Sequence, residues 1–287
     1  KKQQDEPTRL IVMHTNLALY KLGLAGDNLF KYRDGNKAMK SPREILPMRL
    51  AGTFFYYQYG KPNYCYRWCM EDMVEYGMNA SVLRYFVLSC IMNGETNLAR
   101  KYNRILASTL FYKSWAKKYQ YYIDHPDKVA TAPEFANIIS LTAYDNILDG
   151  DDSMLELYLK NSFAYMGGGT PALVEASLLF NLDMKDIPRF WPRFFLYART
   201  HNRIPVHYQE AALLYQHLEQ KVSLDNLPLD RNVVTNFNLF LDYVQKYVQY
   251  PEDQIRPFFY NQFGDTFWFY YFFVKDHSTA GLKRTRS

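Results

Sequence analysis

Two stretches, GKPNYC at residues 60–65 and GETNLA at residues 94–99, decide the fold of this 287-residue chain. Each opens with a glycine and reaches a small side chain, cysteine or alanine, five residues later. With Gly26, these glycines recur every 34 residues, the period of a repeat made of two helices and a turn. Because glycine accepts the positive φ of a tight turn, we predict that all three lie between paired helices. The first unit departs from the pattern, since Lys31 stands five residues after its glycine.

A second echo extends the repeat into the other half of the chain. EASLLF at residues 175–180 returns 35 residues later as EAALLY at residues 210–215. Glycines and prolines fall at helix-length intervals, and no run alternates apolar and polar residues as a strand would. The predicted fold class is therefore all-α, an α–α superhelix. We expect a tetratricopeptide-like solenoid of about six or seven helix pairs.

The same spacing of glycines and prolines suggests a domain organisation. Residues 1–8 form a polar leader, and residues 9–126 form a first group of helical repeats. The turn signals from Asp127 to Pro133 mark the start of a second, continuous group over residues 127–276. Residues 277–287 are expected to be a disordered basic tail.

Composition narrows the classes of function. Apolar residues make up 48% of the chain and aromatic residues 17%, so a sizeable core with aromatic wedges between helices is expected. The net charge of +5 comes from scattered lysines and arginines, which argues against a nucleic-acid partner. The longest apolar run, Phe267–Val274, is too short to span a bilayer. We expect that run to close the helix stack, with docking against a membrane-proximal partner as the alternative. We expect Ile105, Leu106 and Phe111 to fill the gap between two helix pairs.

Three cysteines, Cys65, Cys69 and Cys90, are too few for a disulfide framework. Without clustered histidines they do not suggest zinc, and we expect small buried thiols. No metal and no cofactor are predicted.

Four segments carry a family resemblance: Thr15–Leu19, Ala99–Ala116, His207–Ala211 and Asp265–Tyr271. They resemble the carboxy-terminal region of the DUF6057 family, an uncharacterised family of Bacteroidota membrane proteins. The resemblance implies membrane helices upstream of a soluble helical region. It implies no known activity, and so it transfers no catalytic residue.

The candidate contact residues are polar and aromatic groups near helix ends. The segment Arg189–Phe195 interleaves cations and aromatic rings, a pattern that can bind a partner but also suits a helix with an apolar wedge. The proposed set is His14, Asn16, Arg189, Trp191, Arg193 and His207. We expect them to contact a peptide or protein segment on a concave face of the solenoid.

An enzymatic alternative rests on acidic residues. A helical toroid that processes glycan or envelope polymer would need two carboxylates facing one pocket, and the candidates are Glu175, Glu210 and Asp265. His207 and Glu210 are three residues apart on one helix face, but no third ligand stands at a metal spacing. If Glu175 and Glu210 instead bond main-chain amides, as the shared EA-x-LL pattern suggests, this alternative loses its basis.

The sequence therefore favours a non-catalytic interaction scaffold, the soluble part of a membrane-anchored protein on the extracytoplasmic side. The anchoring segments would lie outside this chain. A purely structural domain of a larger assembly is a third possibility.

Overall fold

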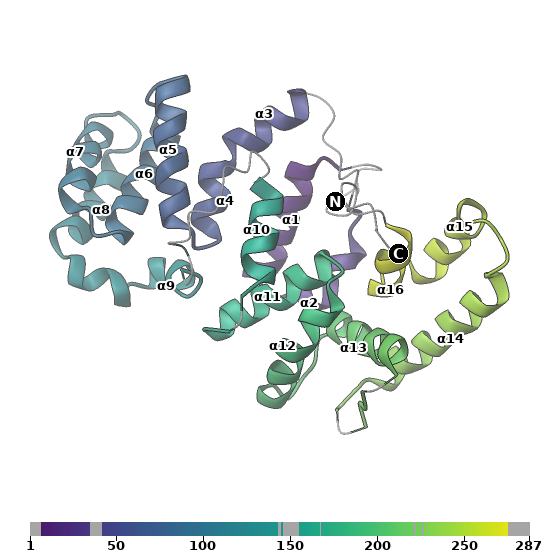
Figure 1. The fold of residues 1–287 in the computed structure, drawn as a ribbon. Helices are drawn as coiled ribbons and strands as arrows, with labels where there is room; N and C mark the ends of the chain where they lie inside the picture. Colours follow the sequence, from purple (N-terminus) through teal and green to yellow (C-terminus); the bar gives the residue numbers. More distant parts are fainter. Residues whose placement is uncertain are drawn as a thin grey trace, which may run out of the picture. The chain divides into compact units, whose positions relative to one another are not determined.

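The computed structural model describes most of the chain, apart from the ends and several short gaps. The described residues are 7–34, 42–142, 145, 155–166, 168–220, 222–225 and 227–274. They form helices and no strand, so the all-α prediction is confirmed (Figure 1). The predicted basic tail and most of the polar leader lie outside the described residues.

The chain divides into two compact units, which are taken separately below. Unit 1 comprises residues 1–44, 160–168 and 174–287, and unit 2 comprises residues 45–159 and 169–173. Unit 1 thus combines segments from both ends of the chain. The boundary that the sequence predicts near residue 127 separates two groups of repeats, and it stays a prediction.

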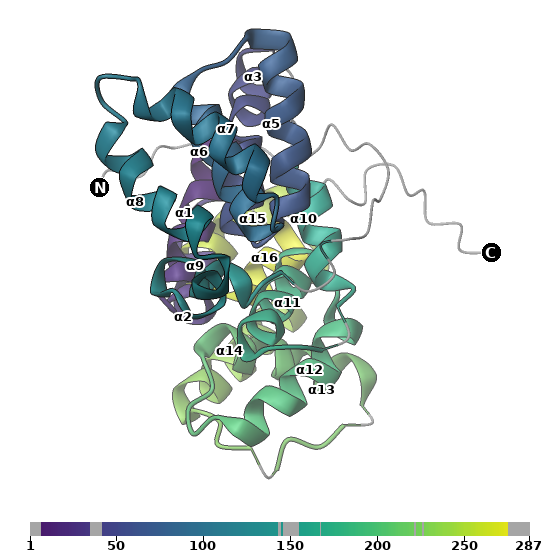
Figure 2. The same cartoon turned by 90° about the vertical axis from the view of Figure 1, so that its left-hand side faces the viewer.

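Unit 2 is a row of helices whose middle members each contact the next helix in the sequence. Its elements are α3 (Pro42–Leu50, from residue 45), α4 (Gly52–Gln58), α5 (Pro62–Tyr76), α6 (Ala80–Met92), α7 (Thr96–Ala107), α8 (Lys113–Asp124), the 3₁₀ helix η2 (Pro126–Thr131), α9 (Pro133–Ile139) and the start of α10 (Leu155–Ala164). Contacts join α4 to α5, α5 to α6, α6 to α7 and α7 to α8, as in an α–α superhelix. Figure 2 shows α6, α7 and α8 side by side.

Two of the three repeat glycines occupy the predicted turns. Gly60 has φ of +66° and joins α4 to α5, and Gly94 has φ of +75° and joins α6 to α7. In each turn the next residue donates its N–H to a carbonyl five positions back, from Lys61 to Tyr56 and from Glu95 to Cys90. This is the six-residue closing bond of the Schellman motif. The small residues five positions after the glycines are fully buried where the helices pair.

The third glycine was assigned wrongly. Gly26 lies inside the short helix α2 (Ala25–Asn28) without a positive φ, and a Cβ placed on it would lie 2.6 Å from Cβ of Pro205. The turn after α1 (Arg9–Lys21) is made by Gly23, with φ of +66° and the bond from Leu24 N–H to the Leu19 carbonyl. Gly26 is therefore a close-approach residue, and its 34-residue spacing is a coincidence.

The same turn recurs once without glycine. Lys185, with φ of +59°, follows α11 (Pro171–Asp183) and precedes α12 (Ile187–Thr200). Asp186 donates its N–H to the Asn181 carbonyl, five positions back. Because a lysine occupies the left-handed position, no glycine in the sequence marks this turn.

Unit 1 is built around α13. Its elements are α1, α2, the 3₁₀ helix η1 (Leu29–Lys31), the end of α10, α11 from residue 174, α12, α13 (Val206–Glu219), α14 (Arg231–Tyr247), α15 (Glu252–Phe263) and α16 (Phe267–Phe273). Helix α13 contacts α2, α12, α14 and α16 (Figure 1). The apolar run expected to close the stack forms α16, which contacts α13 and α15 and buries five of its seven rings.

The echo of residues 175–180 at 210–215 is a framework feature. It falls on α11 and on α13, each of which opens a helix pair. Ala176 and Ala211 are fully buried, and the leucines that follow them are buried as well. The two copies thus present the same packing face. The three cysteines are also buried as free thiols, as predicted.

A matched pair of substitutions tests the turn geometry of unit 2. Gly60→Ala and Gly94→Ala both place a Cβ at positive φ, which costs about 1–2 kcal/mol. A Cβ at Gly60 would also lie 2.5 Å from Cβ of Leu141, whereas the space around Gly94 is open. We expect the urea midpoint to fall clearly further for Gly60→Ala. Equal losses would contradict the packing of residues 138–141 against this turn.

A buried carboxyl also ties unit 2 together. Asp145 accepts a 2.9 Å hydrogen bond from the main-chain N–H of Asn63 in the first turn of α5. Burial raises the pKa of Asp145 to about 7, although that N–H and the Lys61 ammonium partly offset the effect. Burial likewise lowers the pKa of Lys61 to about 8.

The raised pKa of Asp145 predicts a pH dependence. Between about pH 4 and pH 7 the folded carboxyl keeps a proton that the unfolded chain has lost, so stability falls as the pH rises. We expect wild type to lose on the order of 2 kcal/mol more than Asp145→Asn between pH 5 and pH 7.5, measured by urea unfolding. Parallel pH profiles for the two proteins would contradict the assignment.

Candidate functional site

The first turn of α13 carries a cluster of buried polar side chains in unit 1. Pro205 precedes the helix, and the Asp27 carboxylate accepts a 2.9 Å hydrogen bond from Val206 N–H at the helix start. Arg203 donates to both oxygens of Asp27, at 2.9 and 3.0 Å. Burial raises the pKa of Asp27, but these hydrogen bonds outweigh it and hold the pKa below its ordinary value. An anion at a helix N-terminus is stabilising, so this contact fastens α2 to α13.

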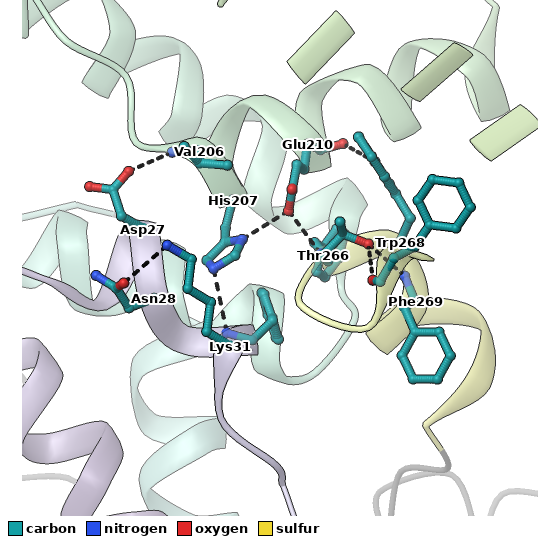
Figure 3. Close-up of polar contacts among 12 residues, drawn as sticks. Asp27, Asn28, Lys31, Val206, His207, Glu210, Thr266, Trp268 and Phe269 are labelled. Atoms are coloured by element: carbon teal, nitrogen blue, oxygen red, sulfur yellow. Dashed lines mark hydrogen bonds and ion pairs between the residues drawn. The ribbon is translucent and has the colours of Figure 1, made fainter. Parts of the chain in front are cut away.

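His207 and Glu210 form the centre of the cluster (Figure 3). Nδ1 of His207 lies 2.8 Å from Oε2 of Glu210, and the same oxygen accepts a 2.8 Å bond from the N–H of Phe267. Nε2 of His207 accepts from the N–H of Phe30 at 3.4 Å. With Nε2 as an acceptor, the ring proton lies at Nδ1, which donates to the carboxylate. One side-chain pair therefore joins η1, α13 and α16.

Two further bonds complete the cluster. The side chain of Gln209 donates to the Ile204 carbonyl at 2.7 Å and accepts from Asp230 N–H at 2.7 Å, just before α14. The indole N–H of Trp268 donates to the main-chain carbonyl of Glu210 at 2.9 Å. Four residues of this turn thus bind main-chain or side-chain groups from α2, η1, α16 and the segment before α14.

A histidine beside a glutamate could act as a general base, but this pair is enclosed. His207 is 1% exposed and Glu210 is 3% exposed. Both ring nitrogens and the shared carboxylate oxygen already have partners inside the protein. The arrangement can fix three chain segments and offers no open position for a substrate. Within the described residues, no three histidine, cysteine, aspartate or glutamate side chains gather to hold a metal.

These contacts correct one site prediction and bear on another. His207 was expected to contact a partner, but it is buried beneath η1 and α16, so no partner reaches it. Glu210 bonds a main-chain amide, as the structural interpretation of the EA-x-LL pattern expects. Asp265, the third acidic candidate, is exposed at the start of α16.

The surroundings of Glu175 differ from those of Glu210, the matching residue of the repeated segment. It is half-buried on α11, and burial raises the pKa of its carboxyl, with a partial offset from His201. Its charge acts on the hydroxyls of Tyr20, Tyr197 and Tyr208. The Tyr208 hydroxyl is buried without a hydrogen-bond partner in the described part of the chain. Glu175 is therefore a carboxyl surrounded by tyrosine hydroxyls. It does not form the pair of carboxylates that a glycan-processing site needs.

The remaining predicted contact residues lie on α1 and α12. On α1, His14 is exposed and Asn16 is half-buried, and partial burial lowers the pKa of His14. On α12, Trp191 packs on the core and stacks on Tyr215 with ring centroids 5.0 Å apart. The binding role of these residues stays a prediction.

The two arginines of α12 have defined partners. Arg189 is exposed, forms an ion pair with Asp186 and lies 4.2 Å over the ring of Tyr165. The guanidinium of Arg193 donates to the Met166 carbonyl and, at 2.6 Å, to the carbonyl of Arg189. The guanidinium of Arg193 therefore joins α12 to the chain just after α10.

Sequence reasoning missed Asp27, Phe30 and Gln209 as members of the α13 cluster. Phe30 contacts His207, 177 positions away, and Asp27 contacts Val206, 179 positions away. No local sequence pattern indicates contacts at this range. An Asp in a short helix has many local roles, and capping a distant helix is only one of them.

Comparison with known families identifies the chain. Residues 1–274 match the family described as a family of unknown function (DUF6057). The chain belongs to this family. No curated protein and no solved structure shows a significant match. None of the helices in the described ranges is long and apolar enough to cross a bilayer.

Removing the central carboxylate tests whether the cluster is structural. Glu210→Ala leaves the buried N–H of Phe267 and Nδ1–H of His207 without an acceptor, each at a cost of about 1–3 kcal/mol. We expect the free energy of unfolding to drop by about 2–4 kcal/mol in urea titration. Asp265→Ala, an exposed carboxylate of the same unit, is the control and should change it by less than about 0.5 kcal/mol. Similar values for both variants would contradict a structural role.

Proposed function

We propose that the protein is a non-catalytic interaction scaffold that binds an extended protein segment on the exposed face of α12. The observation that carries the proposal is the composition of that face. Pro188, Pro192, Phe195 and Leu196 are all exposed on one 14-residue helix, with Arg189 and Arg199 beside them. A solvent-facing helix surface usually carries charged and polar residues, so apolar side chains in this number suit a partner surface.

The scaffold beneath this face is rigid. Ile187, Phe190 and Phe194 fill the core from the opposite side of α12. Arg193 fixes the helix to the Met166 carbonyl, as described above. A preorganised face loses little conformational entropy when a partner binds.

Charge indicates the chemistry of the partner. Arg199 lies 5.4 Å over the Phe195 ring and has no ion-pair partner in the described ranges. An arginine beside an exposed aromatic ring favours a carboxylate next to an apolar side chain. We therefore propose a segment that combines acidic and apolar residues.

The enzymatic alternative has less support. A glycan-processing site needs two carboxylates around one pocket, and the carboxylate of Glu210 is committed to Phe267 and His207. Asp265 is exposed and Glu175 is half-buried, and no hydrogen bond or ion pair within the described part of the chain joins them.

Membrane anchoring belongs to the same proposal. The resemblance to Bacteroidota membrane proteins supports a location in which segments outside this chain cross the membrane and this region is extracytoplasmic. Fractionation of cells that express the full-length gene, followed by protease treatment of intact spheroplasts, tests it. Recovery of this region in a protease-resistant, soluble fraction would contradict it.

Selection from a displayed library of random 12-residue peptides tests the binding proposal. We expect enrichment of peptides that combine acidic and apolar residues. Their affinity for the double variant Leu196→Ser, Arg199→Gln should be at least about tenfold weaker than for wild type. Tyr121→Ser, an exposed residue of unit 2, is the matched control and should bind like wild type.

Two outcomes of the peptide selection would contradict the binding proposal. If no peptide class is enriched, or if enriched peptides bind the α12 variant as tightly as wild type, the α12 face is not the binding site. Turnover of purified envelope glycan by the wild-type chain would instead favour the enzymatic alternative.

A further inference from the structure

The turn between α7 and α8 in unit 2 exposes two adjacent bulky apolar side chains. Leu110 is 86% exposed and Phe111 is 85% exposed. Phe111 was expected to fill a gap between helix pairs, and that prediction was wrong: Leu106 is buried there, while Phe111 points to solvent. Burying a leucine or a phenylalanine is strongly favourable, so leaving both in water is a cost that the fold does not recover.

The turn is held in this conformation by its own polar groups. The hydroxyl of Thr109 donates to the Leu106 carbonyl at 2.7 Å and accepts from the N–H of Tyr112 at 3.2 Å. Arg84 of α6 lies over the rings of Tyr112 and Trp115, at 5.5 and 5.8 Å. The two apolar side chains are thus fixed outward.

A second apolar pair lies at the same end of the helix row. Because α5, α6, α7 and α8 alternate in direction, the α5–α6 connection and the α7–α8 turn fall at one end. Val74, in the last turn of α5, is 86% exposed, and Met78, which follows it, is 64% exposed. One end of the row therefore presents four large apolar side chains.

The charges around this end are basic. Arg104, Lys113 and Lys117 are exposed on α7 and α8, and none of them has an ion-pair partner in the part of the chain that the structure describes. Two of the three acidic residues of α5 are paired, Glu71 with Arg67 and Glu75 with Arg49, and the third, Asp72, is buried. The uncompensated charge at this end is positive.

We propose that this end of unit 2 contacts an anionic lipid surface, with Leu110 and Phe111 inserted among the acyl chains. Two almost fully exposed side chains on a protruding turn offer a protein partner no groove, whereas a fluid apolar medium can surround them on every side. The cations of α7 and α8 lie where lipid phosphates would meet them. Tyr112 and Trp115, half-buried next to the tip, are side chains that favour the membrane–water interface.

Co-sedimentation of the 287-residue chain with vesicles tests the proposal. The probes are vesicles of phosphatidylglycerol mixed with phosphatidylcholine, and vesicles of phosphatidylcholine alone. We expect binding to the anionic vesicles that weakens as salt rises, because surface electrostatics is screened. The double variant Leu110→Ser, Phe111→Ser should bind at least about tenfold more weakly. Lys113→Gln with Lys117→Gln should lose about fivefold per lysine at low salt.

The controls separate insertion from loss of folding. Val248→Ser removes an apolar side chain of unit 1 that is 75% exposed, and this variant should bind like wild type. Because all substituted side chains are exposed, circular dichroism should show unchanged helix content in each variant. In Phe111→Trp, an indole emission that shifts to the blue on adding anionic vesicles would report insertion directly.

Three results would overturn the proposal. They are the absence of binding to anionic vesicles, binding that Leu110→Ser, Phe111→Ser leaves unchanged, and self-association of the chain that this variant abolishes without any vesicle binding. The last result would assign the surface to a second copy of the chain. The lipid contact is independent of the partner proposed for α12, so either proposal can fail without the other.

Discussion

The first turn of α13 is the constraint on which unit 1 depends. Between Val206 and Glu210 it fixes the start of the chain through Asp27 and Phe30, and the end of the chain through Phe267 and Trp268. A helix normally leaves its first N–H groups without partners, and here the carboxylate of Asp27 satisfies one of them from 179 positions away. The first turn of α13 thereby joins residues 27–30 to residues 267–268 within unit 1.

The apolar packing around that turn follows from the polar contacts. Once Glu210 holds the N–H of Phe267, the all-aromatic helix α16 has a fixed position against α13 and α15. The hydroxyl of Tyr270 then reaches Asp183, which also forms a 2.7 Å ion pair with Lys160. A buried ion pair stabilises only when its remaining groups are hydrogen-bonded, and this tyrosine supplies such a bond. Helices α10, α11 and α16 are joined at that point.

The repeat turns of unit 2 could be predicted from the sequence because their chemistry is local. Gly60 and Gly94 occupy left-handed positions, and five residues suffice to recognise them. The same reasoning failed at Gly26, where glycine serves close approach to Pro205, and it missed Lys185, where a lysine adopts the left-handed conformation. Spacing identifies a repeat, but it does not say which of two nearby glycines makes the turn.

The candidate sites were less predictable because their geometry comes from long-range contacts. An i, i+3 pair such as His207 and Glu210 looks alike whether solvent or another helix covers it, and here α16 does. The exposed tip at Leu110 and Phe111 looks like core material in a repeat pattern. Only the arrangement of α7 and α8 shows that none of the described residues of unit 2 covers it. The central claim is that one carboxylate on α13 couples the two ends of the chain. Amide hydrogen exchange in Glu210→Ala tests it most directly. The account predicts that Phe30 and Phe267 lose protection together while Glu95 in unit 2 keeps its own, and unchanged protection at Phe30 and Phe267 would contradict it.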